Sequence, residues 1–132
     1  MKLKISKYNL YKDKTGGLAP FYENKNLEKF KIKRFFFLYG NTRYPRAKHA
    51  HKKCNQLLIP VSGSVLVTII NKKNKKYRFA LTDKNKKILF VPKYHWIKIN
   101  FKKKNSVILT LCDYKYDKKE YIQKLNELLK LK

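Results

Sequence analysis

Short apolar segments of four to eight residues recur along this chain of 132 residues, and polar or turn-forming clusters separate them. Valine, isoleucine, leucine, phenylalanine and tyrosine fill these segments, and most of these residue types favour β-strands. Close spacing of this kind, with no long helical segment between the strands, is typical of an all-β sandwich or barrel. We expect strands at residues 3–8, 18–23, 32–39, 48–51, 56–61, 64–70, 77–81, 88–91, 96–101 and 107–112.

The breaks between the expected strands contain residues that form turns. The polar residues 71–76 predict a hairpin between the strands at 64–70 and 77–81. Pro60 and Gly63 predict a tight connection before residue 64, and Pro92 is expected to end the strand at 88–91.

The hydrophobic pattern changes its period only near the C-terminus. Apolar residues there fall on one side at 3.6 residues per turn, which predicts an amphipathic α-helix over residues 118–131. Asp117 is the expected N-cap, and Glu120 stands at the third position of a capping box. The residues of the apolar side are Glu120, Tyr121, Leu125, Leu128 and Leu129.

Length and composition indicate one domain, with a β-barrel over residues 1–117 and the helix after it. No apolar run approaches the roughly 18 residues of a membrane helix, and the lysine-rich start is unlike a signal peptide. Cys54 and Cys112 form neither a disulfide framework nor a metal-binding pair of the CxxC type. We therefore expect a cytoplasmic protein with reduced cysteines and no membrane partner.

The chain is strongly basic, with 34 lysine and arginine residues, 8 acidic residues and a net charge of +26. Such a charge raises the possibility of nucleic-acid binding, because basic side chains neutralise phosphates. The lysines, however, are spread along the whole chain, and arginine is the better reader of phosphates and bases. Nucleic acid is therefore not the partner we expect. Only four residues are arginine: Arg34, Arg43, Arg46 and Arg78.

Two of the three histidines, His49 and His51, stand two residues apart in one expected strand. Side chains at this spacing point to the same face of a strand, so the two imidazoles are expected to lie side by side. Arg46 and Lys52 add positive charge next to them. This arrangement favours a site where an anionic substrate loses and regains a proton.

The pattern His49-x-His51-x4-Gln56-x6-Gly63 resembles the first sequence motif of the cupin superfamily. The resemblance implies a small jelly-roll β-barrel with the site inside it. Metal-binding cupins usually have Glu at the position of Gln56, and a neutral amide is a weaker ligand than a carboxylate. We therefore expect no metal, although a metal site formed by His49, His51 and His95 remains an alternative.

A second resemblance covers almost the whole chain. The pattern Arg46-x-x-His49-Ala50-His51-Lys52-x-x-x-Gln56 is similar to the signature of the nucleotide-sugar 3,4-ketoisomerases, which are cupins acting on dTDP-4-keto-6-deoxyglucose. Further matches follow the same order along the chain: Asp13-x-x-Gly16-x-Leu18 with Glu23, Ile32-Lys33-Arg34, Pro92-x-x-x-Trp96, and Tyr116-Asp117-x-x-Glu120-Tyr121-Ile122.

The chain also departs from the family pattern at several positions. Ala47 replaces the glycine that follows the arginine of the signature. Thr15 replaces an arginine, Ile97 a histidine and Gln123 an arginine, while two tyrosines of the third expected strand become Phe36 and Phe37. These differences concern the groups that bind the sugar and leave the histidine pair intact.

The resemblance implies a proton-transfer reaction that moves a keto group from C4 to C3 through an enediol. His51 would be the main base and acid, and His49 would assist. The enediolate would receive a hydrogen bond from His49 or Tyr39. The remaining substrate-binding residues would be Arg46 and Lys52 for the diphosphate, Gln56 for a hydroxyl group, and His95 and Trp96 in the wall of the site.

The same resemblance implies no cofactor, a role in deoxysugar and polysaccharide biosynthesis, and a homodimer that exchanges N-terminal strands, with residues 3–8 as the candidate. Two other functions remain open at this point. One is a metal-dependent cupin enzyme that uses His49, His51 and His95. The other is a non-catalytic basic cupin that binds nucleic acid or a sugar.

Overall fold

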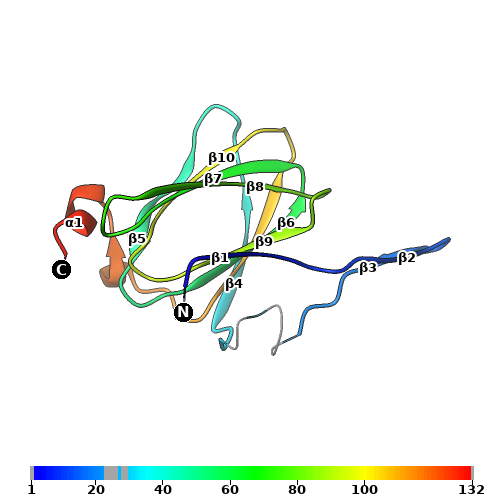
Figure 1. The fold of residues 1–132 in the computed structure, drawn as a ribbon, viewed down its shortest axis with the longest axis horizontal. Coiled ribbons are helices and arrows are strands. Elements are labelled where there is room, and N and C mark those ends of the chain that lie inside the picture. The colour runs from blue at the N-terminus through cyan, green and yellow to red at the C-terminus, as the bar shows by residue number, and fades with distance from the viewer. Residues whose placement is uncertain (1, 23–26, 28–29, 132) are drawn as a thin grey trace.

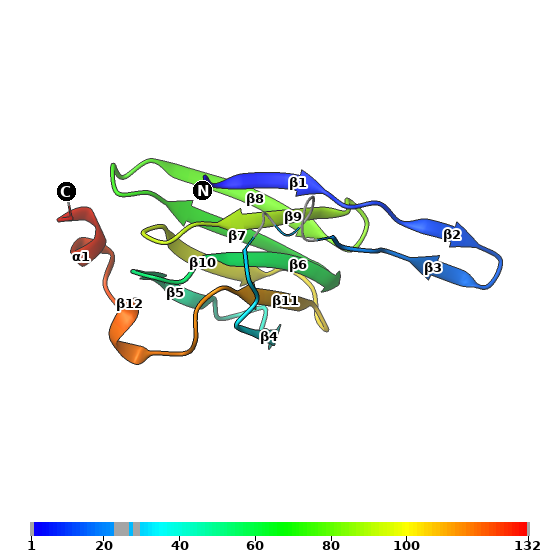
Figure 2. The same ribbon diagram turned by 90° about the horizontal axis from the view of Figure 1, so that it is seen from below.

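The computed structural model describes residues 2–22, 27 and 30–131. Two five-stranded antiparallel sheets enclose the interior of a barrel (Figures 1 and 2). The first sheet has the order β1 (Lys4–Lys7), β9 (Lys87–Val91), β6 (Gln56–Ser62), β11 (Val107–Cys112) and β4 (Arg34–Tyr39). The second has the order β12 (Tyr121–Ile122), β5 (Arg46–His51), β10 (Trp96–Phe101), β7 (Ser64–Ile70) and β8 (Lys76–Thr82). The all-β cupin-type prediction is confirmed.

The main core lies between the two sheets and follows the alternation of the strands. On β7, Val65, Val67 and Ile69 point inward and are at most 1% exposed. Ile97 and Ile99 of β10 face the same interior. Each such side chain contributes roughly 1.5–3 kcal/mol when it leaves water, so the burial of this face stabilises the packing of the two sheets.

Most expected strands are confirmed, and those at 64–70, 96–101 and 107–112 match residue for residue. The predicted hairpin is the antiparallel pair of β7 and β8.

The prediction was wrong near the N-terminus, where β2 (Tyr11–Asp13) and β3 (Gly16–Leu18) form a separate hairpin in place of a strand at 18–23. Every residue of these two strands is exposed, so the hairpin has no apolar alternation to reveal it. Glu23, also expected there, lies outside the described residues.

The predicted helix over 118–131 is wrong for its first half. A short 3₁₀ helix, η1 (Lys118–Glu120), leads into β12, and the α-helix α1 spans only Leu125–Leu129. β12 takes the edge position next to β5, with Tyr121 opposite His51 and Ile122 opposite Ala50. Pairing with an open sheet edge outweighs the helical pattern at these residues. Asp117 does act as a cap, because its carboxylate accepts a hydrogen bond from the Lys119 amide of η1.

A local irregularity in β5 precedes the histidines. Ala47 and Lys48 have φ angles of 71° and 59°, and the register with β10 shifts between Ile97 and Lys98. Two consecutive left-handed residues form a bulge that changes which face the following side chains occupy. The ring of His49 consequently contacts that of His51, and His49 lines the barrel interior.

Within the described part of the chain, no helix has the length and apolar character needed to cross a membrane.

Candidate active site

A cavity of about 350 Å³ opens inside the barrel, with residues of β4, β5, β6, β10, β11 and β12 around it. Aliphatic and aromatic side chains form much of its wall. The polar residues of the wall are Arg34, Arg46, His49, Gln56, Thr110 and Tyr121. None of the residues lining the cavity is acidic. An apolar cavity with a few converging polar groups is the usual form of a small-molecule site.

His51 forms a buried pair with Glu120 next to this cavity. Its Nδ1 donates to Glu120 Oε2 at 2.5 Å, and the two side chains are 4% and 1% exposed. The other carboxylate oxygen accepts from the Lys53 and Cys54 amides at 3.0 and 3.2 Å. Burial alone would raise the pKa of Glu120, but the hydrogen bonds from His51 and these amides outweigh it and hold the pKa below its usual value. Glu120 is therefore a carboxylate whose two oxygens both accept hydrogen bonds.

This pairing determines which nitrogen of His51 can act as a base. Because Nδ1 carries the proton that Glu120 accepts, Nε2 has a free lone pair in the neutral ring. Burial lowers the pKa of His51, against the opposing effect of Glu120, so the ring stays neutral near pH 7. The rings of His49 and Tyr121 lie against His51, at centroid distances of 4.8 and 4.4 Å. His51 thus stands behind the two residues that line the cavity.

His49 is the histidine at the cavity wall. Burial, followed by repulsion from His51, lowers its pKa to about 4. Its ring also packs edge-on against Tyr121 at a centroid distance of 4.9 Å. A neutral imidazole here can donate or accept a hydrogen bond but carries no positive charge at neutral pH.

Arg34 supplies the positive charge at the histidine end of the cavity. Its Nη2 donates to Tyr121 Oη at 3.4 Å, and its guanidinium lies over the rings of Phe36 and Tyr116 at 5.4 and 5.5 Å. Burial alone would lower the pKa of Arg34, but the hydrogen bond to Tyr121 raises it, so the group remains charged. Arginine held between aromatic rings is well placed to meet a developing negative charge.

Three buried polar side-chain atoms in the described part of the chain have no hydrogen-bond partner: Arg34 Nε, His51 Nε2 and Thr110 Oγ1. Arg34 and Thr110 line the cavity, and His51 lies directly behind its wall. A buried polar group without a partner costs roughly 1–3 kcal/mol. Three of them around one cavity indicate a site whose ligand supplies the missing partners.

The structure brings some of the expected site residues together and separates others. Arg46 and Gln56 line the cavity with His49. Gln56 donates to Cys112 Sγ at 3.8 Å. The residue that hydrogen-bonds to His51 and fixes its tautomer is Glu120. Tyr39 does not line the cavity, and its side chain is 69% exposed.

Lys52 belongs to an exposed bend after β5, and its side chain is not part of the cavity wall. Its backbone has a clear role, because the Lys52 amide donates to the Glu120 carbonyl at 2.8 Å and ties the C-terminal segment to β5.

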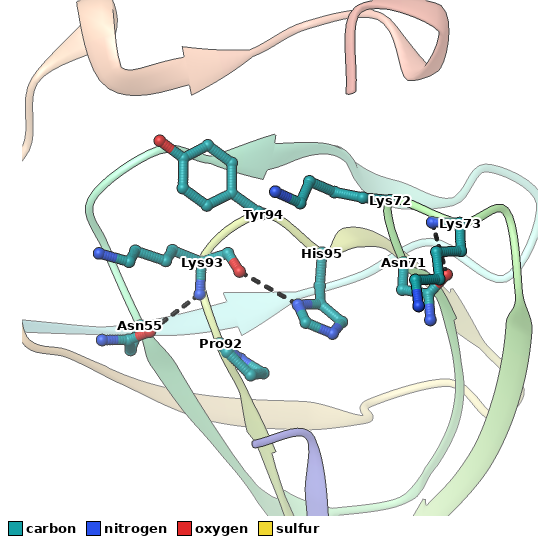
Figure 3. A pocket seen from close by; sticks show the side chains of 8 residues that line it. All are labelled: Asn55, Asn71, Lys72, Lys73, Pro92, Lys93, Tyr94 and His95. Atoms are coloured by element: carbon teal, nitrogen blue, oxygen red, sulfur yellow. Dashed lines mark hydrogen bonds between the residues drawn. The ribbon is translucent and has the colours of Figure 1, made fainter. Parts of the chain in front are cut away.

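His95 and Trp96 also lie away from the cavity. His95 lines a separate basic hollow of about 620 Å³ with Lys72, Lys73 and Lys93, and its Nδ1 donates to the Lys93 carbonyl at 3.1 Å (Figure 3). Trp96 packs in the small core under α1. His95 therefore does not join the other two histidines. Among the described residues, no three His, Cys, Asp or Glu side chains come together in a metal-binding cluster.

Sequence reasoning missed Glu120, Tyr121, Arg34 and Thr110 as parts of the site. Glu120 and Tyr121 were attributed to the apolar side of a helix. A signal was present, because both residues fall in the C-terminal stretch that is similar to the ketoisomerases, and acidic residues are scarce in this chain. Arg34 falls in another matched stretch. Nothing in the sequence distinguishes Thr110 from an ordinary strand residue.

Comparisons of the sequence and of the structure find similar proteins that match nearly the whole chain. The family described as "FdtA: WxcM-like, C-terminal" matches residues 1–132. The TDP-4-oxo-6-deoxy-alpha-D-glucose-3,4-oxoisomerase of Aneurinibacillus thermoaerophilus is 30% identical over 131 residues, which cover 98% of this chain and 92% of the relative. A 3,4-ketoisomerase structure from Helicobacter canadensis has a TM-score of 0.85 and 30% identity over 98% of this chain and 96% of its own. The sugar 3,4-ketoisomerase QdtA from Thermoanaerobacterium thermosaccharolyticum, solved in complex with TDP, has a TM-score of 0.86 and 25% identity over 96% and 91%.

Proposed function

The chain belongs to the FdtA (WxcM-like, C-terminal) family, and from this premise we propose that it is a dTDP-sugar 3,4-ketoisomerase. Its substrate would be dTDP-4-keto-6-deoxy-D-glucose and its product a dTDP-3-keto-6-deoxyhexose. The observation that carries the proposal is the buried His51–Glu120 pair, whose free Nε2 stands beside a cavity with unpartnered polar groups. Curated and structural relatives that are 3,4-ketoisomerases support the same reaction.

The reaction begins with removal of the C3 proton, which is acidic because C3 is next to the C4 carbonyl. His51 Nε2 takes this proton, and Glu120 stabilises the imidazolium that results. Because Nε2 is buried and the rings of His49 and Tyr121 lie against His51, neighbouring side chains must move for the substrate to reach this nitrogen. The negative charge on the enediolate oxygen meets Arg34 and the donor of His49. His51 then returns the proton to C4.

The diphosphate of the substrate would bind at the outer end of the cavity. Arg46 lines the cavity and is itself exposed, so its guanidinium can meet a phosphate that remains partly in water. Lys52 follows the opposite end of β5 from Arg46, so Arg46 is the residue of this pair that can meet a phosphate at the cavity. The net charge of +26 would attract the nucleotide sugar from a distance.

The proposal includes a homodimer in which N-terminal strands are exchanged. Within one chain, β1 pairs with β9, and an exchange would form the same pairing with a second copy. The β2–β3 hairpin extends away from the barrel (Figure 2). On the outer face of β4, the side chains of Phe35 and Tyr39 are 61% and 69% exposed, and a second copy would cover them. Light scattering is expected to give twice the chain mass of 15.9 kDa, and Phe35→Glu is expected to shift the protein towards monomer.

We also propose that the enzyme acts in the cytoplasm. Cys54 and Cys112 are both free and buried, and a reducing compartment would keep them so.

The proposed function is tested by following the purified protein with dTDP-4-keto-6-deoxyglucose by NMR. The expected result is a new 3-keto isomer at a rate that a chelator does not change. Loss of activity with a chelator, restored by a metal ion, would support the metal-dependent alternative instead. If the sugar nucleotide or a nucleic acid binds equally well to wild type and to the double variant His49→Asn, His51→Asn, and no isomer forms, the protein is a binding module.

A further inference from the structure

Thr110 presents a buried hydroxyl group to the cavity, and no step of the proposed reaction uses it. Its side chain lies in β11 and lines the cavity, yet the residue is only 1% exposed. Among the described residues, Thr110 Oγ1 has no hydrogen-bond partner. Valine at this position would keep the shape of the side chain and avoid the cost of an unpaired hydroxyl. The hydroxyl therefore indicates a partner that a ligand brings into the cavity.

The side chains next to Thr110 in the cavity wall are apolar. In the register of the first sheet, Thr110 stands between Phe36 of β4 and Leu58 of β6, and both residues line the cavity. From the second sheet, Ile97 and Ile99 of β10 line the same cavity. Hydrocarbon side chains neither donate nor accept hydrogen bonds, so Thr110 is a single polar point in this section of the wall.

One row of the first sheet separates Thr110 from the histidine end of the cavity. The next row in that direction consists of Arg34, Cys112 and Gln56. Arg34 donates to the Tyr121 hydroxyl, and the Tyr121 ring contacts both histidines. Thr110 therefore lies one step away from the place where the reacting carbons of a substrate would bind.

The phosphate end of the cavity lies in the opposite direction. Arg46 begins β5 and His51 ends it, and Arg46 also lines the cavity. On β10, Ile97 stands opposite His49 and Ile99 opposite Arg46, so the cavity extends from the histidines towards Arg46 along these two isoleucines. A nucleotide sugar that places its diphosphate at Arg46 and its reacting carbons at the histidines passes Thr110 with the atoms between them.

The chemistry of the sugar identifies those atoms. The diphosphate is attached to C1, and the keto group moves from C4 to C3. C2 connects these two parts, and it carries the one sugar hydroxyl that the reaction leaves unchanged. The other edge of the ring has the ring oxygen and C5 with its methyl group, which offers no hydroxyl and suits the apolar wall.

We propose that Thr110 determines specificity for nucleotide sugars with a hydroxyl at C2, through a hydrogen bond between Oγ1 and that hydroxyl; this assignment rests on the proposed function. A threonine hydroxyl can donate to or accept from a second hydroxyl. A sugar without the C2 hydroxyl leaves Thr110 buried and unpaired in the complex. Sites built to pair a substrate hydroxyl reject the analogue that lacks it, because their own polar group then has no partner.

The test compares kcat/KM for dTDP-4-keto-6-deoxyglucose and for its 2-deoxy analogue, dTDP-4-keto-2,6-dideoxyglucose. Wild type should prefer the first sugar by about a hundredfold. Thr110→Val should reduce this preference to about threefold, because it loses the bond to the C2 hydroxyl and no longer has an unpaired group beside the analogue. Conversion of the analogue should therefore be faster in Thr110→Val than in wild type, which a merely structural role for Thr110 would not produce.

Two further variants serve as controls. Thr110→Ser keeps the hydroxyl and should keep most of the preference. Thr68→Val changes another buried strand threonine, on β7 and outside the cavity wall, and should leave the preference unchanged.

The outcomes distinguish this assignment from the proposed function. If wild type isomerises both sugars equally well, or if Thr110→Val keeps the wild-type preference, the function stands and the assignment of Thr110 is wrong. If wild type isomerises neither sugar, the function is wrong and the assignment falls with it. Should Thr110→Val fail to fold, Thr110→Cys replaces the hydroxyl with a weakly hydrogen-bonding thiol and should lower the preference about tenfold. An unchanged preference in Thr110→Cys would overturn the proposal.

Discussion

In the candidate site, Glu120 orients His51 through a side chain that does not line the cavity. Its carboxylate orients the ring of His51 and accepts two backbone amides, so it cannot turn towards another partner without leaving buried donors unpaired. Removal of the carboxylate would free His51 to adopt either tautomer. In the proposed reaction the identity of the basic nitrogen thus depends on a residue some seventy positions away along the chain.

Ala47 carries a backbone conformation that suits glycine. Its φ of 71° costs an L-residue roughly 1–2 kcal/mol, and glycine stands at this position in the family pattern that the sequence resembles. We expect Ala47→Gly to raise the free energy of unfolding by about 0.5–1 kcal/mol, after the larger chain entropy of glycine is subtracted. Ala80→Gly is the matched control in β8, where φ is negative, and it should lower stability by about 0.5–1 kcal/mol in urea unfolding. The same sign for both variants would contradict the strain at Ala47.

The depressed histidine pKa values predict a loss of stability in acid. His49 stays neutral in the folded chain down to a pKa of about 4, whereas in the unfolded chain it binds a proton below about 6.5. Stability is therefore complete above pH 6.5 and falls as the pH drops towards 4, by about 1.4 kcal/mol per unit. His51 adds to the effect in the same direction.

Urea unfolding at several pH values measures this loss directly. Glu120 stabilises the fold fully above its unfolded pKa of 4.5 and loses this contribution only below it, so the histidines dominate the change in stability between pH 6.5 and 4.5. His49 should account for a loss of about 3 kcal/mol in this window, and His49→Asn should remove that part. An equal pH dependence in wild type and His49→Asn would show that His49 is not held neutral.

Residues of the candidate site could be predicted where they lie close together in the sequence. His49, Gln56 and Arg46 were identified because one short motif contains them all. Glu120 and Tyr121 reach the site only through the pairing of β12 with β5, a long-range contact that a local period cannot report. Tyr39 was expected in the site, but it falls on the opposite face of β4 from Phe36, as strand alternation requires.

At the level of elements, the C-terminal segment acts as a clamp on the end of β5. η1 and β12 bring Glu120 and Tyr121 to His51, and the short helix α1 follows them. Leu128 of α1 is fully buried in a small cluster with Ala50 and Ile122. This cluster anchors the segment that completes the site.

Leu128→Ala should weaken the clamp. Removal of a fully buried leucine side chain costs about 2–5 kcal/mol, and here the loss should fall on the segment that holds Glu120. Leu129→Ala, one residue further and only partly buried, is the control and should cost about 1 kcal/mol or less. Hydrogen exchange should show faster exchange at β12 in Leu128→Ala before global unfolding. Unchanged protection of β12 in that variant would mean that α1 does not anchor it.

Strand prediction succeeded where one face of a strand is buried. β7 and β10 alternate between the core and the outer face, so their limits follow from the sequence. The β2–β3 hairpin is exposed on both faces, and β12 has only two residues, so neither shows an alternation long enough to be recognised. In the C-terminal segment, helical periodicity and strand pairing competed, and the open edge of β5 decided the outcome.

At the scale of the whole molecule, the net charge of +26 should affect capture of the substrate more than its conversion. We expect kcat/KM for the nucleotide sugar to fall several-fold when salt rises from about 20 to about 300 mM, because salt screens long-range attraction. The value of kcat should stay nearly constant, since the His51–Glu120 pair is buried. Steady-state kinetics at several salt concentrations checks this. A fall in kcat with constant kcat/KM would contradict electrostatic capture.

The proposed reaction depends on His51 as the group that moves the carbon-bound proton. The most direct test is the exchange of the C3 hydrogen of dTDP-4-keto-6-deoxyglucose in deuterated water, followed by NMR for wild type and His51→Asn. We expect the variant to exchange at least about a hundredfold more slowly, because asparagine cannot act as a base. His95→Asn, which changes the histidine of the separate basic hollow, should exchange at the wild-type rate. Exchange by His51→Asn at the wild-type rate would contradict the account.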